Sequence, residues 1–418
     1  MVEEQSSGDL APQQKSWCNW SGSVQASPRR IVAPSSEQEL IEQIGAAAGQ
    51  GLTIRVAGSG HSFTPLCASD GLLLSLDHLQ GMISADVRSR RATFWAGSKL
   101  WQIGEPLWNA GLALANMGDI DRQALAGAIA TGTHGTGPTL GSLSTQVAGL
   151  RIITAAGGII ECSETVEPEL FRAARVSLGV FGVITQITLR AVPAYHLLET
   201  SRAFAFEECL ARLDELIAGN RHFEFFWVPG ADICAAKMLN PTALREPPAA
   251  PETRSVSGWV ARYVRPPRIA ESFRTFPSTR ERLFNEIEFA IPAASGPACL
   301  RELRELLRGH YPEVEWPIEY RTLAADDIDL SPAFQRPTVT ISLHQGVGLP
   351  QVRFFADAEA IFRRYQGRPH WGKMHGHTAD KLRALYPRWD AFHEQRRKLD
   401  PCGVFLNDYL RGLFGEPV

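Results

Sequence analysis

Three glycine-rich segments in the first half of the chain constrain the fold more than any other feature of the sequence. They are Gly58-Ser59-Gly60-His61-Ser62-Phe63, Gly132-Thr133-His134-Gly135-Thr136-Gly137 and Leu178-Gly179-Val180-Phe181-Gly182-Val183-Ile184. Glycine lets backbone N–H groups approach a pyrophosphate or an aromatic ring without obstruction by a Cβ atom. One such segment alone is more often a tight turn. Three in one half of the chain predict a long ligand, such as a dinucleotide, that lies across several loops.

The first of these segments departs from the usual dinucleotide fingerprint. Gly58 and Gly60 have the spacing of the first two glycines of G-x-G-x-x-G, but Phe63 stands at the third position. The third glycine normally allows a helix to pack closely on a strand. The segment is therefore not a plain nicotinamide-binding loop, and the role of His61 needs a separate explanation.

The composition is that of a globular protein without broad attraction to nucleic acid. The chain has 418 residues, 44% hydrophobic and 21% charged, which suits two domains or one large domain with an insertion. With 42 Lys+Arg against 45 Asp+Glu, the net charge is −3, which argues against a nucleic-acid partner. No apolar run approaches the ~18 residues of a membrane span. The polar start MVEEQSSGDLAPQQKSW has no signal-peptide core, and the seven cysteines contain no C-x-x-C pair, so we expect a cytoplasmic protein.

Hydrophobic periodicity predicts an α+β fold. Residues 31–56 follow a strand–helix–strand pattern, with a capping box of Ser36 and Glu39 before the helix. Further along the chain, the patterns predict strands at 72–74, 92–95, 147–156, 183–191 and 223–227, and helical stretches at 100–111, 206–218 and 297–308. The composition changes after Pro193, which indicates a second structural unit.

The tail contains His370, His375 and His377 in an H-x4-H-x-H pattern. Imidazoles are common metal ligands. No cysteine or carboxylate lies at tight ligand spacing, however, and Lys373 adds a positive charge in the middle of the pattern. We therefore expect no metal site, and a metal-dependent sugar-binding module remains only an alternative.

Glu319 and Arg321 flank Tyr320 in a segment typical of a strand. Alternation along a strand points both charged side chains to one face. The residues alone favour a surface ion pair, which contributes little to stability. A role in substrate binding is the alternative.

Five segments, taken in order, resemble the aldonolactone oxidase branch of the vanillyl-alcohol oxidase flavoprotein family, which includes gulonolactone, arabinonolactone and alditol oxidases. The segments are RVAGSGHSFTP, GDIDRQALAGAIATGTHGTG, VSLGVFGVITQITL, RPHWGKMHG and LDPCGVFLNDYL. The resemblance extends from about Asn19 to the C-terminus. Any one segment is weak, whereas the five in this order are specific.

The resemblance implies an FAD-binding domain of two α+β subdomains and an α+β cap domain that covers the flavin ring. We accordingly expect an FAD-binding domain at residues 1–196, a cap or substrate domain at 197–368, and a C-terminal segment at 369–418 that returns to the first domain and the flavin face. In this branch the histidine that matches His61 is bonded to the 8α-methyl group of the flavin, although related enzymes without it bind FAD noncovalently. The residues implied to contact FAD are Arg55, Ala57, Gly58, Ser59, Gly60, His61, Ser62, Gly118, Asp119, Gly127, Ala130, Thr131, Gly132, Thr133, His134, Gly135, Gly182, Val183, Ile184, His370 and Asn407.

The resemblance also gives the charged residues a catalytic interpretation. It implies that Glu319 and Arg321 contact substrate hydroxyls from a cap-side strand, and that Lys373 reaches the substrate at the flavin face. The implied reaction is oxidation of a CH–OH group of a sugar-derived aldono-1,4-lactone by hydride transfer to flavin N5. Oxygen or another acceptor then reoxidises the flavin.

Two other functions stay open at this point. Alditol oxidation is the close alternative, although the tail segments look nearer to the gulonolactone type. A noncatalytic flavin-binding protein is an alternative of a different class. The sequence leaves the choice between oxidase and dehydrogenase open.

Overall fold

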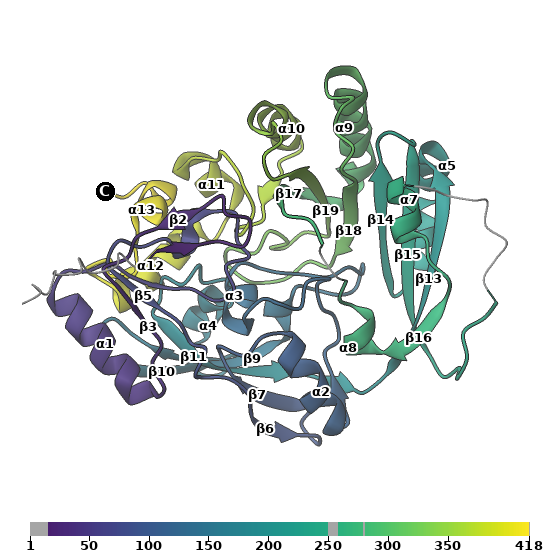
Figure 1. Ribbon diagram of the computed structural model, residues 1–418. Helices are drawn as coiled ribbons and strands as arrows, with labels where there is room; N and C mark the ends of the chain where they lie inside the picture. Colours follow the sequence, from purple (N-terminus) through teal and green to yellow (C-terminus); the bar gives the residue numbers. More distant parts are fainter. Residues whose placement is uncertain (1–15, 250–257, 279–280, 418) are drawn as a thin grey trace, which may run out of the picture.

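The computed structural model describes residues 16–249, 258–278 and 281–417, so nearly all of the polar N-terminal stretch lies outside the described residues. The first half of the described chain is built on two small sheets (Figure 1). A parallel sheet has the order β3-β5-β4, and an antiparallel sheet has the order β10-β9-β11-β7-β6. Their strands are β3 (Arg30–Val32), β4 (Ile54–Val56), β5 (Leu72–Leu74), β6 (Met82–Asp86), β7 (Arg91–Trp95), β9 (Val147–Ile153), β10 (Ile159–Ser163) and β11 (Val183–Arg190).

Short pairings and helices complete this half. Two small pairings join β1 (Trp17–Cys18) to β2 (Gln25–Ala26), and β8 (Leu112–Ala113) to β12 (Val192–Pro193). The helices are α1 (Glu37–Gly49), α2 (Trp101–Asn109), α3 (Leu125–Ala130) and α4 (Pro168–Ala174), with the 3₁₀ turns η1 (Pro65–Cys67) and η2 (Leu143–Gln146).

Local sequence explains how several of these elements begin and end. The Ser36 side chain accepts a hydrogen bond from the N–H of Glu39, which caps α1 as predicted. Strand β9 ends at Ile153, three residues earlier than predicted, because the chain turns back into β10 at Gly157 with φ +78°. The mixture of helices and sheets confirms the predicted α+β class.

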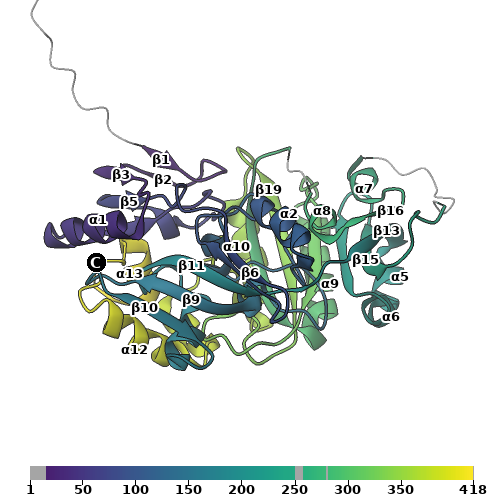
Figure 2. The same cartoon turned by 90° about the horizontal axis from the view of Figure 1, so that it is seen from below.

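The C-terminal helices pack on the first half of the chain. They are α11 (Ala379–Leu385), α12 (Trp389–Leu399) and α13 (Asp408–Phe414), and both views place α12 and α13 beside elements of the first half of the chain (Figures 1 and 2). Phe392 of α12 and Phe414 of α13 belong to the same hydrophobic core as Leu40 of α1 and Phe181. Segments from both ends of the described chain therefore share one core.

An antiparallel sheet of eight strands forms the second half of the fold. Its order is β16-β13-β15-β14-β18-β19-β17-β20. The strands are β13 (His196–Ala205), β14 (His222–Val228), β15 (Ile233–Thr242), β16 (Arg268–Glu271), β17 (Phe284–Pro292), β18 (Ile318–Leu323), β19 (Thr338–Gly346) and β20 (Arg368–Pro369). The helices are α5 (Phe206–Ala211), α6 (Leu213–Ala218), α7 (Gly258–Tyr263), α8 (Ser272–Thr275), α9 (Gly296–His310) and α10 (Val352–Arg364), with the 3₁₀ turn η3 (Ala293–Ser295). The predicted helical stretch 206–218 is thus two short helices.

The two faces of the large sheet differ in chemistry. Phe223, Phe225 and Tyr320 are fully buried in a core with α5, α6, α9 and α10. Glu224 and Arg321 alternate with them along the same strands and line cavities on the other face, towards the first half of the chain. The large sheet therefore presents a charged face to the N-terminal half. Across the described ranges, no helix combines the length and apolar character needed to cross a membrane.

Candidate active site

A cavity between the two small sheets is lined by residues from all three glycine-rich segments or their close neighbours. It encloses about 770 Å³, its open mouth included. Of the residues predicted to contact FAD, those on its wall are Arg55, Ala57, Gly58, Ser62, Gly127, Ala130, Thr131, Gly182, Val183 and Ile184. The sequence analysis missed the wall segments at 76–77 and 96–99. Gly97 stands there without neighbouring glycines, so these segments do not resemble the three glycine-rich segments. We name this space the cofactor cavity.

The backbone packs very closely at two glycines of the cofactor cavity. A Cβ atom at Gly97 would lie 1.9 Å from the carbonyl oxygen of Leu76, and one at Gly182 would lie 2.3 Å from that of Ile153. Gly182 also has φ +127°, which L side chains rarely adopt. Only glycine leaves the cavity wall in place at these positions.

Arg55 is a buried cation on the wall of the cofactor cavity. Its guanidinium donates hydrogen bonds to the backbone carbonyls of Leu66, Leu178, Gly179 and Phe405. Burial lowers the pKa of Arg55 to about 10, so the group stays protonated near neutral pH. It forms no ion pair with a carboxylate among the described residues. Arg55 therefore ties the wall segments of the cofactor cavity together, and the glycine-rich wall leaves room for a long ligand such as FAD.

A second space, the inner pocket, adjoins the cofactor cavity. It encloses about 590 Å³ with its mouth and shares Ser62 and Thr131 with the cofactor cavity. Of the residues predicted for the site, its wall contains His61, Ser62, Gly118, Asp119, Thr131, Thr133, His134, Arg321, His370 and Lys373. The fold thus brings Lys373, near the C-terminus, and Arg321 of β18 together with the first glycine-rich segment.

His61 lies in the wall of the inner pocket, with its ring centroid 5.7 Å from that of Trp20. Burial, followed by the positive charges of Lys373 and Lys99, lowers the pKa of His61 to about 4. The imidazole is therefore neutral at physiological pH. A neutral ring keeps the nitrogen lone pair that nucleophilic attack needs.

Six of the predicted residues line neither space: Ser59, Gly60, Gly132, Gly135, Glu319 and Asn407. Asn407 caps α13 and donates to the carbonyls of Pro65 and Ala68, so it holds the turn behind the cofactor cavity. Glu319 forms an ion pair with Arg321. Their predicted contacts with FAD or substrate remain predictions.

A row of charged residues crosses three neighbouring strands of the large sheet. Glu224 of β14 stands directly opposite both Lys237 of β15 and Arg321 of β18. Glu224 lies 3.1 Å from Lys237 Nζ and 2.9 Å from Arg321 Nε, and Asp119 lies 3.3 Å from Arg321 Nη2. Arg321 and Glu319 are both buried, so the surface interpretation of this pair is wrong. The sequence analysis missed Glu224 and Lys237 because no motif marks them.

The charges in this row stabilise one another against burial. Burial alone would raise the pKa of Glu224, but the charges of Lys237 and Arg321 outweigh it and hold this pKa below its ordinary value. Burial likewise opposes the charge of Arg321, yet Glu319, Asp119 and Glu224 raise its pKa well above the ordinary value. Arg321 is therefore a permanent, firmly held cation at the inner pocket.

Strand β17 adds two acids on the same face, Glu286 and Glu288. Glu286 forms an ion pair with Lys373, and Glu288 lies 2.6 Å from the Nε2 atom of His134. Both acids are buried. The two acids are separated by one apolar residue in a strand-like segment, as Glu319 and Arg321 are, and this alternation indicates that both side chains point to one face of the sheet. It was available in the sequence and was missed.

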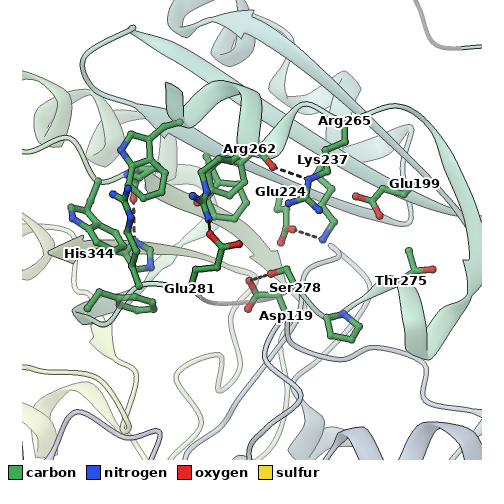
Figure 3. A pocket seen from close by; sticks show the side chains of 18 of the residues that line it. Asp119, Glu199, Glu224, Lys237, Arg262, Arg265, Thr275, Ser278, Glu281 and His344 are labelled. Carbon is green, nitrogen blue, oxygen red and sulfur yellow. Dashed lines mark hydrogen bonds and ion pairs between the residues drawn. The ribbon is translucent and has the colours of Figure 1, made fainter. Parts of the chain in front are cut away.

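A third space, the outer cavity, opens beside the inner pocket (Figure 3). It encloses about 960 Å³ with its mouth and shares Asp119 and Phe284 with the inner pocket. Figure 3 shows Glu224 beside Lys237 on its wall, and Asp119 next to Ser278. The outer cavity is thus a charged space that adjoins the inner pocket.

The tail histidines do not gather as metal ligands. His370 lines the inner pocket, whereas His377 Nδ1 lies 3.0 Å from a carboxylate oxygen of Glu359 on α10. In the part of the chain that the structure describes, no group of three or more His, Cys, Asp or Glu residues could hold a metal ion. All seven cysteines fall within the described part and are free thiols.

Two family models match the chain. One, described as D-arabinono-1,4-lactone oxidase, covers residues 187–266 and 249–413, and the other, an FAD binding domain, covers residues 28–163. The chain is 38% identical to L-gulono-1,4-lactone dehydrogenase of Mycobacterium tuberculosis (strain H37Rv) over 96% of this chain and 99% of that protein. It is 32% identical to L-gulonolactone oxidase of Mus musculus over 95% of this chain and 97% of that protein.

Among solved structures, the fold is similar to that of a cholesterol oxidase from B. sterolicum. The TM-score is 0.83, and the similarity covers 99% of this chain and 100% of that chain. The sequences are only 16% identical, so this likeness concerns the fold alone.

Proposed function

Because the chain belongs to the aldonolactone oxidase branch of the vanillyl-alcohol oxidase family of FAD-dependent oxidoreductases, we propose that it oxidises a CH–OH group of an aldono-1,4-lactone of the gulonolactone type. One observation carries this proposal. Arg321 and Lys373, two cations from distant parts of the chain, enter one pocket that adjoins the cofactor cavity. A neutral polyhydroxylated ring offers few apolar contacts, so charged hydrogen-bonding groups must provide its recognition.

The residues of the inner pocket have separate tasks in this proposal. FAD, when bound, supplies the two-electron acceptor for the hydride. Arg321 holds the substrate oxygen and stabilises the negative charge that develops as its proton leaves; a guanidinium does not act as a base. Glu319, which pairs with Arg321 but does not line the inner pocket, orients Arg321; its hydrogen bond with a substrate hydroxyl is the part of this assignment that the family resemblance alone supports. Lys373 holds a second hydroxyl.

We also propose that the FAD is bonded covalently to His61. The position of His61 in the inner pocket, next to Ser62 at the junction with the cofactor cavity, and its neutral imidazole support the bond. Denatured wild-type protein is expected to keep flavin fluorescence on the polypeptide, and His61→Ala is expected to release it. Complete extraction of the flavin from denatured wild-type protein would rule the bond out.

The division into domains is likewise a proposal: an FAD-binding domain at 1–196, a cap domain at 197–368, and a returning segment at 369–418. The large sheet runs from His196 to Pro369, and the helices that follow it pack in the core of the first half. Both facts support these limits. The free thiols support a reducing compartment, so we keep the proposal of a cytoplasmic location.

Anaerobic flavin reduction by a panel of sugars tests the proposed reaction. We expect L-gulono-1,4-lactone or D-arabinono-1,4-lactone to bleach the flavin absorbance, with xylitol and sorbitol slower. Faster bleaching by the alditols would favour the alditol oxidase alternative, and no bleaching by any sugar would favour a noncatalytic flavin-binding protein. Admission of air to the reduced protein then separates an oxidase, which regains its colour rapidly, from a dehydrogenase that needs another acceptor.

A further inference from the structure

Lys237 of β15 is connected to Arg321 through one shared acid, Glu224 of β14. The Oε1 atom of Glu224 lies 3.1 Å from Lys237 Nζ, and its Oε2 atom accepts a hydrogen bond of 2.9 Å from Arg321 Nε. The three side chains are only 16%, 7% and 8% exposed in the order Lys237, Glu224 and Arg321. Each carboxylate oxygen of Glu224 therefore binds a different cation, and the carboxylate cannot rotate without losing one of them.

Glu224 is the acid with which Lys237 forms an ion pair among the described residues. Glu199 of the neighbouring strand β13 pairs with Arg268 instead, at 2.5 Å. Burial opposes the charge of Lys237, but nearby acids, Glu224 foremost, raise its pKa above the ordinary value. Lys237 is therefore a cation whose ion pair is with the acid that also binds Arg321.

Lys237 and Glu224 do not line the inner pocket. Both line the outer cavity and a small cavity of about 280 Å³, its mouth included. Arg321 lines this small cavity and the inner pocket. Within the row Lys237–Glu224–Arg321, only Arg321 is thus placed to touch a substrate in the inner pocket, and the other two residues act through it.

The contacts of Arg321 leave one guanidinium nitrogen for a ligand. Nε donates to Glu224, and Nη2 forms ion pairs with Asp119, at 3.3 Å, and with Glu319. No hydrogen bond between described residues engages Nη1. Because the guanidinium is planar and rigid, the acids at Nε and Nη2 also fix the direction of Nη1.

We propose that Lys237 is a positioning residue, which holds Glu224 and through it keeps the guanidinium of Arg321 in the orientation that the reaction needs. The proposal deepens the proposed function and rests on it for the role of Arg321. Without Lys237, the Oε1 atom of Glu224 loses its partner in a buried place, which is costly. We expect the carboxylate to turn and the guanidinium to shift with it.

Three variants separate positioning from a general loss of packing. Lys237→Met removes the charge and keeps an unbranched side chain. Lys237→Arg keeps a cation for Glu224, and the outer cavity leaves room for the larger group. Arg268→Met is the matched control, because it removes a cation that also lines the outer cavity but belongs to the pair with Glu199.

Anaerobic rapid mixing with the sugar that bleaches the wild-type flavin fastest gives the first test. We expect Lys237→Met to lower the limiting reduction rate by roughly 10–100-fold, because a misplaced positioning group can cost about 10²-fold. FAD content should not change, since Lys237 does not line the cofactor cavity. Lys237→Arg should restore most of the rate, and Arg268→Met should keep it. An unchanged rate in Lys237→Met, or equal slowing in Arg268→Met, would overturn the proposal.

A double-mutant cycle tests whether Lys237 acts through Glu224. The amide of Glu224→Gln accepts through one oxygen only, so it cannot bind both cations as the carboxylate does. In this background we expect Lys237→Met to slow reduction little further. Multiplication of the two single effects contradicts the proposal. A wild-type rate in Glu224→Gln alone contradicts it as well, even if Lys237→Met does not fold.

A crystal structure of the Lys237→Met holoprotein tests the positioning without any sugar. We expect Glu224 to leave Nε of Arg321 or to turn away from its wild-type plane. An unmoved contact between Glu224 and Arg321 would refute the role of Lys237. If no sugar reduced the wild-type flavin, the proposed function would fail, and this structure would still decide whether Lys237 positions Arg321.

Discussion

Replacing Arg321 with alanine is expected to slow flavin reduction and to destabilise the fold by separate mechanisms. The guanidinium contacts three carboxylates, those of Asp119, Glu224 and Glu319; Arg321, Glu224 and Glu319 are buried, and the Asp119 side chain is 13% exposed. In the wild type the pKa of Arg321 is raised well above its ordinary value: burial opposes the charge, but these three acids outweigh it. The alanine variant leaves the acids buried without this cation.

The expected magnitudes follow from these contacts. Removing one partner from a buried ion pair costs about 3–5 kcal/mol of unfolding free energy. At ~1 °C per kcal/mol for a chain of 418 residues, this lowers the thermal midpoint by roughly 3–6 °C. Removing one donor that stabilises developing charge slows the chemical step by about 10²–10³-fold. Arg321→Lys keeps a point charge without the planar fork, so we expect it to lose less stability but most of the rate.

The stability loss depends on pH with a definite sign. In the wild type, burial opposes ionisation of Glu224, but Lys237 and Arg321 keep its pKa below the ordinary value. Its stabilising contribution is therefore present above the unfolded pKa of about 4.3 and is lost as the pH falls through the lowered value. The difference in stability between wild type and Arg321→Ala should shrink below about pH 4.

Two assays separate these effects. Anaerobic rapid mixing with saturating substrate measures the reduction step, and thermal unfolding followed by protein fluorescence measures stability. FAD content should remain close to that of the wild type, because Arg321 does not line the cofactor cavity. A reduction rate near that of the wild type would remove Arg321 from the mechanism, and an unchanged thermal midpoint would refute the charge network described here.

Two further predictions concern the cofactor cavity and a buried acid. Gly97→Ala should fail to bind FAD, because its Cβ would lie 1.9 Å from the Leu76 carbonyl oxygen. In Gly127→Ala the added Cβ meets no protein atom within 4 Å, so this variant should keep the apoprotein fold. Equal FAD loss and equal unfolding in both variants would contradict the proposed role of Gly97. Burial raises the pKa of Asp326 to about 6, despite hydrogen bonds that lower it. The folded chain then holds a proton that the unfolded chain releases between about pH 4 and the raised value, so the unfolding free energy should fall by up to about 2–3 kcal/mol as the pH rises through this window. Thermal midpoints of wild type and Asp326→Asn from pH 4 to 7 test this: only the wild type should show the fall.

Local patterns predicted much of the secondary structure. Residues 72–74 form β5 with the predicted bounds, and Ser36 caps α1 as its spacing to Glu39 indicates. Such features depend on neighbours a few residues apart, which the sequence displays directly. The helical stretch 206–218 was predicted as one element but is two, separated at Arg212. Amphipathic periodicity continues across the break and therefore does not reveal it.

The candidate site was only partly visible in the sequence. Alternation and resemblance together pointed to Glu319, Arg321 and Lys373, and Arg321 and Lys373 do line one pocket. Asp119 was predicted to contact FAD, and in the structure it also lies 3.3 Å from Arg321. The sequence analysis included Glu224 only as one residue of the predicted strand 223–227. No local sequence pattern indicates which strands lie beside that strand.

The sequence by itself determined the class of ligand and the polarity of each strand face, because glycine spacing and side-chain alternation are properties of the chain. Only the tertiary structure decided which charges meet. Glu224 contacts Lys237 and Arg321 because the register of β14 with β15 and β18 places all three opposite one another. A shift of one residue would turn a strand's side chains to the other face and separate them. Ion-pair energies depend on distance and on exclusion of water, and long-range strand pairing sets both.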